Sequence, residues 1–115
     1  MLIKQSARPV RTMKNVMDGN GELTLHDLTT PETLPDNLRV LCVISLKPGE
    51  AVGHHTHTVE TEVYHCLKGE GVVHDNGKDV LVYPGDTVVA PSGTVHGIKN
   101  TSLSDFELLA IVVHD

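Results

Sequence analysis

Short runs of β-branched and other apolar residues alternate with turn sequences along most of this chain. Asp-Asn-Gly at residues 75–77 and Pro-Gly at residues 48–49 and 84–85 supply the φ values that tight turns require. The Asp-Asn-Gly sequence between two valine-rich runs is typical of a β-hairpin. The runs that predict strands are residues 40–46, 62–67, 72–74, 80–83, 87–90 and 106–113.

Helical periodicity is nearly absent from the chain. A single helical turn is expected near Thr30 and Pro31, with Thr30 as its cap and Pro31 in the first helical position. Many short strands favour an antiparallel all-β sandwich or barrel. We expect one domain, 1–115, in which residues 22–115 form the barrel and residues 1–21 form an N-terminal arm or an edge strand.

Several of the predicted strands are apolar on both faces. In residues 40–46 the even positions can face the interior while Leu41 and Val43 face outward, and residues 106–113 have the same character. A sheet with one face in water should instead alternate between apolar and polar residues. Either another part of the same chain covers the second face, or a second copy does. We expect a homodimer.

Composition and charge exclude several classes of protein. The net charge of −6 and the scattered positions of Arg8, Arg11 and Lys14 do not provide the basic surface that nucleic acids or anionic membranes require. No apolar run approaches the roughly 20 residues of a transmembrane helix, and the first residues do not resemble a secretory signal. We therefore expect a cytoplasmic protein, with Cys42 and Cys66 as small buried thiols.

The chain has eight histidines, an unusual number for 115 residues. His55 and His57 are two positions apart, a spacing that places both imidazoles on the same face of an extended chain. Glu62 begins the next predicted strand and can point back toward them, and His96 can supply a further ligand from a distant strand. Imidazole nitrogens with a carboxylate oxygen suit a divalent ion such as Mn, Fe, Co, Ni, Cu or Zn.

Two blocks of sequence carry a family resemblance. The first is Gly-x5-His-x-His-x4-Glu-x6-Gly, and the second is Gly-x5-Pro-x-Gly-x2-His-x3-Asn. The chain resembles the cupin family in both blocks, which together cover residues 49–100. The residues at the specified positions are Gly49, His55, His57, Glu62 and Gly69 in the first block, and Gly85, Pro91, Gly93, His96 and Asn100 in the second.

The resemblance implies a double-stranded β-helix, or jelly-roll, barrel with one divalent metal ion held by His55, His57, Glu62 and His96. Four protein ligands leave open positions on an octahedral ion, unlike a closed structural zinc site. The glycines of the two blocks are expected to adopt turn conformations with positive φ, and Asn100 to fix a loop through its side chain.

If Glu62 points inward, strand alternation sends Tyr64 and Cys66 inward as well. Tyr64 is the candidate catalytic residue: it can hydrogen-bond a substrate or relay a proton, or it can be a core aromatic residue. Cys66 is expected to be an inert buried thiol. His54 is expected to be a loop residue that faces away from His55. We assign none of the remaining histidines to the metal: His26, His65, His74 and His114.

These features favour a metal-dependent enzyme that acts on a small, polar, oxygen-bearing substrate able to chelate the ion. The fold does not choose among dioxygenase, isomerase, decarboxylase and lyase chemistry. A non-catalytic cupin that binds or senses a small ligand is the alternative, and processing of unsaturated uronic sugars is a minor one. Scarce aromatic residues count against flavonols, and Arg39 as the only arginine near the barrel strands counts against sugar phosphates.

Overall fold

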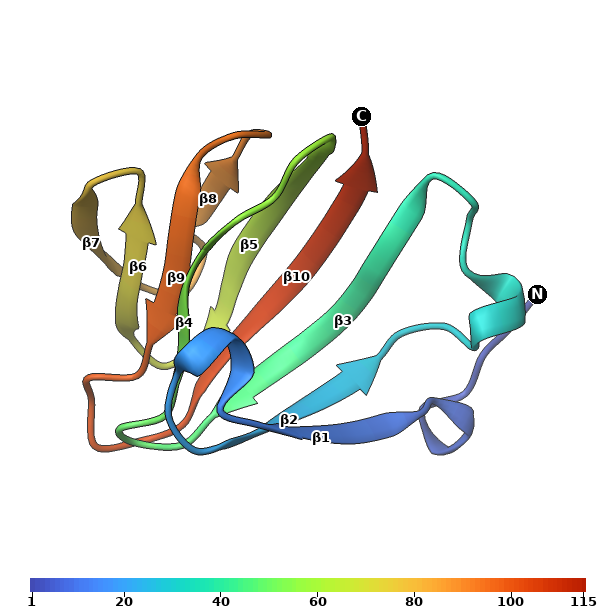
Figure 1. Ribbon diagram of the computed structural model, residues 1–115. Coiled ribbons are helices and arrows are strands. Elements are labelled where there is room, and N and C mark those ends of the chain that lie inside the picture. The colour runs from blue at the N-terminus through green and yellow to red at the C-terminus, as the bar shows by residue number, and fades with distance from the viewer.

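The computed structural model describes residues 1–115 and contains ten strands in two antiparallel sheets that pack face to face (Figure 1). The six-stranded sheet has the order β1 (Val10–Lys14), β2 (Glu22–Asp27), β3 (Leu38–Leu46), β10 (Phe106–His114), β5 (Glu60–Lys68) and β8 (Thr87–Ala90). The four-stranded sheet has the order β4 (Ala51–Thr56), β9 (Val95–Lys99), β6 (Gly71–Asp75) and β7 (Lys78–Val82). This arrangement confirms the predicted double-stranded β-helix.

Three short 3-10 helices complete the fold: η1 (Gln5–Ala7), η2 (Val16–Asp18) and η3 (Pro31–Thr33). The last is the predicted helical turn, with Thr30 as its N-cap and Pro31 in its first turn. None of the three has the length and apolar character that crossing a membrane would require.

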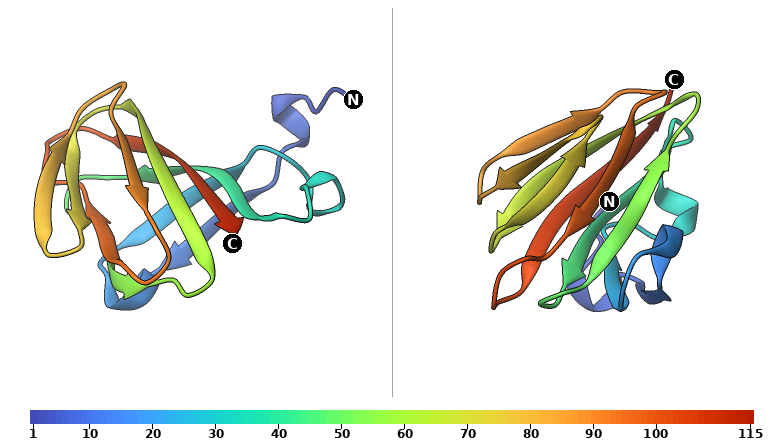
Figure 2. Two further views of the ribbon diagram at one scale, coloured as in Figure 1. Left: turned by 90° about the horizontal axis from the view of Figure 1, so that it is seen from above. Right: turned by 60° about the vertical axis from the view of Figure 1, so that its left-hand side comes forward.

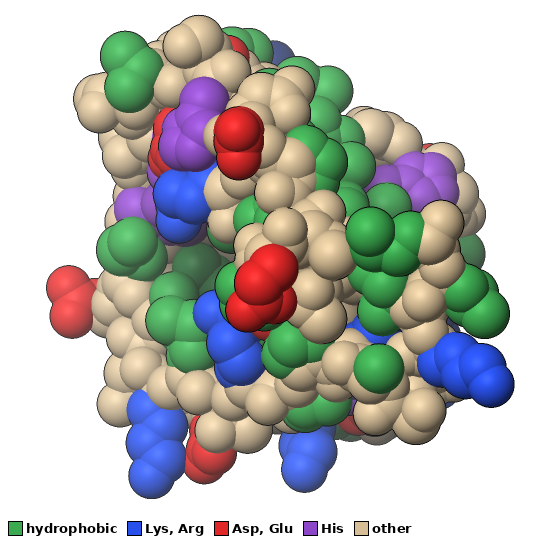
Figure 3. All heavy atoms as spheres, turned by 90° about the vertical axis from the view of Figure 1, so that its right-hand side faces the viewer, with side chains coloured by type: hydrophobic (Ala, Val, Ile, Leu, Met, Phe, Trp, Pro, Cys, Tyr) green, Lys and Arg blue, Asp and Glu red, His purple; other side chains and the backbone are tan.

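The N-terminal segment contributes an edge strand, one of the two predicted outcomes. β1 pairs with β2 from Val10 opposite His26 to Lys14 opposite Glu22, and no other strand pairs with β1. Figure 2 shows the N-terminus beyond the end of the barrel, on the side of β1 and β2. The same side, seen in Figure 3, carries exposed hydrophobic side chains among interspersed acidic and basic ones.

The hydrophobic core lies between the two sheets and follows the predicted alternation. On β10 the inward side chains of Phe106, Leu108 and Ala110 are completely buried, whereas their neighbours are half-buried. On β5 the inward residues Tyr64 and Cys66 are buried beside Glu62, as predicted. Glu62 therefore continues a core-facing row of side chains toward one end of the barrel.

The opposite end of the barrel is closed by tight packing around Phe106. A Cβ atom at Gly71 would lie 2.4 Å from the Phe106 ring, so only glycine leaves room for this side chain. Asn100 is fully buried, and its Nδ2 donates hydrogen bonds to the carbonyls of Leu46 and Ser104. Asn100 thus fixes the loop before β10, as expected.

Besides the N-terminal edge strand, three strands lie outside the predicted runs: β2, β4 and β9, each of which carries a histidine. β4 and β9 pair with each other, and His54 lies inside β4. The prediction of a loop at His54 is therefore wrong. Glycine and polar residues break the apolar pattern of β4 and β9, and pairing within the sheet overrides this weak local preference.

Candidate metal centre

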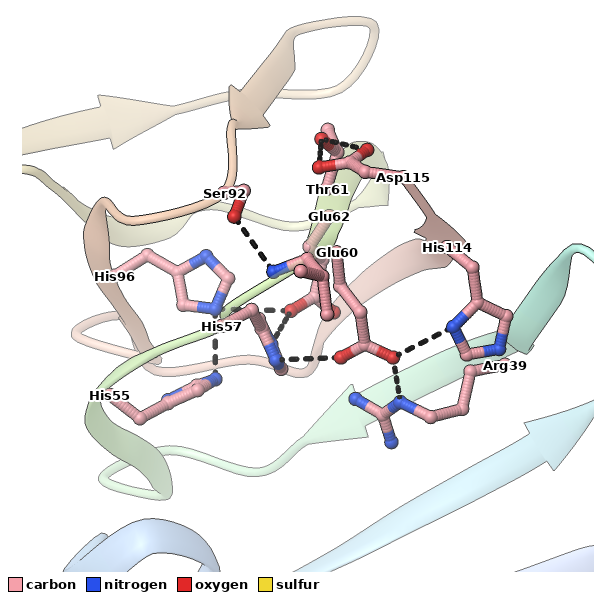
Figure 4. Close-up of polar contacts among 11 residues, drawn as sticks. Arg39, His55, His57, Glu60, Thr61, Glu62, Ser92, His96, His114 and Asp115 are labelled. Atoms are coloured by element: carbon pink, nitrogen blue, oxygen red, sulfur yellow. Dashed lines mark hydrogen bonds and ion pairs between the residues drawn. The ribbon is translucent and has the colours of Figure 1, made fainter.

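His55, His57, Glu62 and His96 meet at the end of the barrel opposite Phe106. His55 lies on β4 directly opposite His96 on β9, His57 follows the end of β4, and Glu62 lies on β5. Each of the four residues offers one ligand atom, and these atoms lie within 4.8 Å of one another. Figure 4 shows the three imidazoles and the Glu62 carboxylate pointing toward a common point.

The separations within this group match those expected for ligands of one ion. Glu62 Oε1 lies 3.0 Å from His57 Nε2 and 3.1 Å from His96 Nε2, and His55 Nε2 lies 2.8 Å from His96 Nε2. Two ligands at about 2.1 Å from an ion and at right angles to each other would be about 3.0 Å apart. The four side chains therefore form a group that could hold one metal ion.

The other ring nitrogen of each histidine has its own environment. His55 Nδ1–H donates a hydrogen bond to the Gly53 carbonyl at 2.8 Å, which leaves Nε2 free to act as a ligand. His57 Nδ1 lies 3.3 Å from Glu60 Oε1. His96 Nδ1 is buried without a hydrogen-bond partner, so the polar contacts of this ring are made through Nε2.

Glu60 is a further residue of the site that the sequence motifs did not identify. Its carboxylate contacts His57 on one side, and Arg39 and His114 on the other (Figure 4). The hydrogen bond from Arg39 holds the pKa of Glu60 below its usual value, so this carboxylate is ionised at neutral pH. The only signal in the sequence is the spacing His57-x-x-Glu60 in a turn, where acidic residues are common for other reasons.

Comparison with known proteins agrees with this geometry. The family described as Cupin domain matches residues 42–112. The chain belongs to the cupin family. An oxalate-binding protein of Thermotoga maritima is 38% identical over 113 residues, which are 98% of this chain and 93% of that protein.

Solved cupin structures have the same fold. The crystal structure of a predicted oxalate decarboxylase from Thermotoga maritima has a TM-score of 0.93 and 37% identity, and all of each chain is covered. A Cupin 2 conserved barrel domain protein from Salinispora arenicola has a TM-score of 0.73 and 21% identity, with 98% of this chain and 87% of that chain covered. The second likeness concerns the fold alone.

The protonation of the candidate ligands in this cupin suits metal binding. Burial lowers the pKa of His55 below its ordinary value of 6.5, and the nearby His96 and His57 act in the same direction. Burial by itself would raise the pKa of Glu62, but the hydrogen bond and the charge of His96, together with His57, lower it overall. At neutral pH the site therefore holds a neutral His55 imidazole and an ionised carboxylate, which are the forms that bind metals.

Tyr64 lies beside these ligands and inside the hydrophobic core. Its ring is 5.6 Å from the His96 ring, and its side chain is almost completely buried. Burial raises the pKa of Tyr64 well above 10, and the negative charge of Glu62 adds to this effect. The phenol is therefore protonated, so it can donate a hydrogen bond but cannot act as a base.

A small cavity opens beside the candidate ligands. Its volume is about 160 Å³, and hydrophobic side chains form most of its wall. Pockets for drug-sized ligands usually have about 300–1,000 Å³, so this cavity suits a much smaller molecule. A larger hollow of about 270 Å³ near Arg11 and Asp27 contains none of the four candidate ligands.

The two cysteines are buried free thiols, as predicted. Burial raises the pKa of Cys42 to about 12 and also raises that of Cys66. Both therefore remain thiols and do not offer thiolate ligands.

The histidines outside the centre occupy different surroundings. His65 contacts the Thr87 hydroxyl at 2.7 Å, and His114 contacts Glu60. His54 and His74 stack on each other on the outer face of the four-stranded sheet.

Proposed function

We propose that His55, His57, Glu62 and His96 bind one divalent metal ion, and that this cupin uses the ion to bind a small chelating carboxylate of the oxalate class. The convergence of the four ligand atoms at the end of the barrel carries this proposal. Manganese, iron, cobalt, nickel, copper and zinc all accept this ligand set.

The ligand class is inferred from the cavity and from the relatives. An oxalate-binding protein and a predicted oxalate decarboxylase are both more than a third identical to this chain. The cavity of about 160 Å³ has room for a molecule of that size and is small for a flavonol. When bound, a divalent ion offers open positions to two oxygens of one ligand and balances their charge.

Arg39 does not act as a dicarboxylate clamp in this proposal. The sequence counts against sugar phosphates because Arg39 is the only arginine near the barrel strands. Arg39 lines the cavity, but Glu60 already pairs with its guanidinium group. Recognition of a dicarboxylate therefore rests on chelation rather than on paired basic side chains.

Turnover of the bound ligand is the second candidate function, and the position of Tyr64 beside Glu62 favours it. Its protonated phenol next to Glu62 can donate a proton or a hydrogen bond toward the site. However, the high pKa of Tyr64 makes proton release costly, and the Glu62 carboxylate is engaged with two histidines. For these reasons we place ligand binding first and metal-dependent catalysis second.

Calorimetric titration of oxalate into metal-stripped and Mn²⁺-loaded protein tests the first function. We expect heat of binding only with the loaded protein, because the ion supplies the contacts to the carboxylates. Acetate, which cannot chelate through two carboxylates, should bind much more weakly. His96→Ala should abolish binding, whereas His65→Ala, which changes an imidazole outside the site, should not.

Equal oxalate binding by stripped and loaded protein would overturn the proposal. ¹³C NMR of labelled oxalate incubated with the metal-loaded protein distinguishes turnover, the second candidate function, from binding alone. An unchanged oxalate signal supports a binding protein. New carbon signals that disappear in Tyr64→Phe would instead show turnover that depends on the phenol.

A further inference from the structure

Four residues form a row across the outer face of the four-stranded sheet. Gly97 on β9 pairs with His74 on β6, and His74 pairs with Asp79 on β7. The register of β4 against β9 shifts between Val52 and His55, so that Gly53 and His54 together face the single residue Gly97. Side chains of three different strands are therefore aligned on one face.

Gly97 allows the two imidazoles of this row to meet. A Cβ atom at position 97 would lie 2.8 Å from Cδ2 of His54, so the missing side chain leaves space for the His54 ring. The ring reaches across β9 and stacks on His74, with 3.9 Å between ring centroids and 16° between planes. Two side chains separated by a whole strand thereby come into contact.

Asp79 adds a carboxylate to the imidazole pair. Its Oδ1 lies 2.8 Å from Nδ1 of His74, and one ligand atom from each of His54, His74 and Asp79 lies within 4.8 Å of the others. Two imidazoles and a carboxylate are ligands that suit Zn²⁺, Ni²⁺, Co²⁺ and Cu²⁺. The Asp79 side chain is 69% exposed and the His74 side chain 17%, so an ion can enter from solvent.

We propose that His54, His74 and Asp79 form a second metal site, which takes a transition-metal ion such as Zn²⁺ on the outer face of the sheet. This site is distinct from the centre inside the barrel, because successive side chains of a strand point to opposite faces. His55 points inward and its neighbour His54 points outward, so the proposal does not depend on the proposed function.

Binding of the ion requires a small local rearrangement. The lone pairs of stacked, nearly parallel rings do not converge on one point, so one ring must turn. His54 is the ring that turns, since it is exposed and makes no side-chain hydrogen bond. Coordination through Nδ1 of His74 moves the ring proton to Nε2, so the 3.3 Å hydrogen bond from the Gly77 amide to this atom is lost.

Zinc titration of a variant without the barrel centre, His55→Ala with His96→Ala, tests the proposal by calorimetry. We expect one Zn²⁺ per chain. His74→Ala or Asp79→Asn in the same background should weaken binding by roughly tenfold or more, which corresponds to at least about 1.4 kcal/mol. His65→Ala is the matched control, because it removes an outward-facing imidazole of the other sheet and should leave the affinity unchanged.

If the double variant does not fold, the wild-type chain serves for the same test. His74→Ala should then reduce the zinc stoichiometry from two ions per chain to one, and zinc should shift the amide resonance of Gly77 in the parent protein only. The single variant His96→Ala should remove the other equivalent and keep the shift of the Gly77 resonance, so the two sites are distinguishable. Zinc binding that is unaffected by both His74→Ala and Asp79→Asn would overturn the proposal.

Discussion

At the scale of single residues, His57 lies between two carboxylates: that of Glu62, a candidate ligand of the ion, and that of Glu60. Its Nε2 lies 3.0 Å from Glu62, and its Nδ1 lies 3.3 Å from Glu60. A carboxylate behind a metal-binding histidine fixes the orientation of the ring and raises its basicity. Glu60 is in turn held by Arg39, so we infer that Glu60 positions His57 without binding the ion.

Glu60→Gln tests this positioning role. The amide keeps the shape of the side chain but removes its charge, so we expect affinity for Mn²⁺ to fall by about 10- to 100-fold. Competition with a coloured chelator measures the change. Glu70→Gln is the matched control, since Glu70 is an exposed residue that makes no side-chain hydrogen bond or ion pair; an equal effect of both variants would show that Glu60 has no special role.

The candidate ligands could be predicted from the sequence because their spacing is fixed by strand geometry. His55 and His57 share a face by simple alternation, and the second motif placed His96 near them. Glu60 was not predicted, because its contact with His57 depends on the path of a turn. The stack of His54 on His74 depends on a register shift and on the missing side chain of Gly97. Neither feature can be inferred from the sequence around these residues.

At the scale of elements, the strands with an apolar interior were predicted, among them β5, which carries Glu62. The two strands that carry His55 and His96, β4 and β9, were not among the predicted runs. β3, β5 and β10 repeat apolar residues at every second position, because their inward side chains fill the core. On β4 and β9 the inward positions hold His55 and His96 in place of apolar residues. The candidate ligands on β4 and β9 thus break the apolar pattern by which these two strands would be recognised.

The outer face of β3 and β10 leads to a prediction about assembly. Leu109 lies beside Val43, and Ile111 beside Leu41, and all four side chains are only half-buried in the single chain. Covering this apolar surface with a second copy would remove it from water. The homodimer expected from the sequence remains a prediction that rests on this face.

Light scattering at micromolar concentration measures the state of assembly. We expect a mass near twice the 12.4 kDa of one chain. Ile111→Arg should shift the protein toward the monomer, because a charge in the covered face is costly. Leu81→Arg, at a residue of the other sheet that is 62% exposed, should leave the mass unchanged. A monomeric parent protein would contradict the prediction.

At the scale of the whole molecule, the two ends of the barrel have different tasks. Phe106, Leu46 and Asn100 close one end with completely buried side chains. The other end holds the histidines and Glu62, beside a cavity large enough for a small ligand. The pairing register of the strands brings the candidate ligands from distant parts of the chain to one point.

Anomalous X-ray diffraction from crystals grown with Mn²⁺ tests whether the four side chains at the end of the barrel bind one metal ion. We expect an anomalous peak between Nε2 of His55, His57 and His96 and the carboxylate of Glu62, at about 2.0–2.2 Å from each ligand atom. The peak should disappear in crystals of His96→Ala. A parent crystal with manganese in the solvent and no peak at this position would contradict the proposed metal centre and the function built on it.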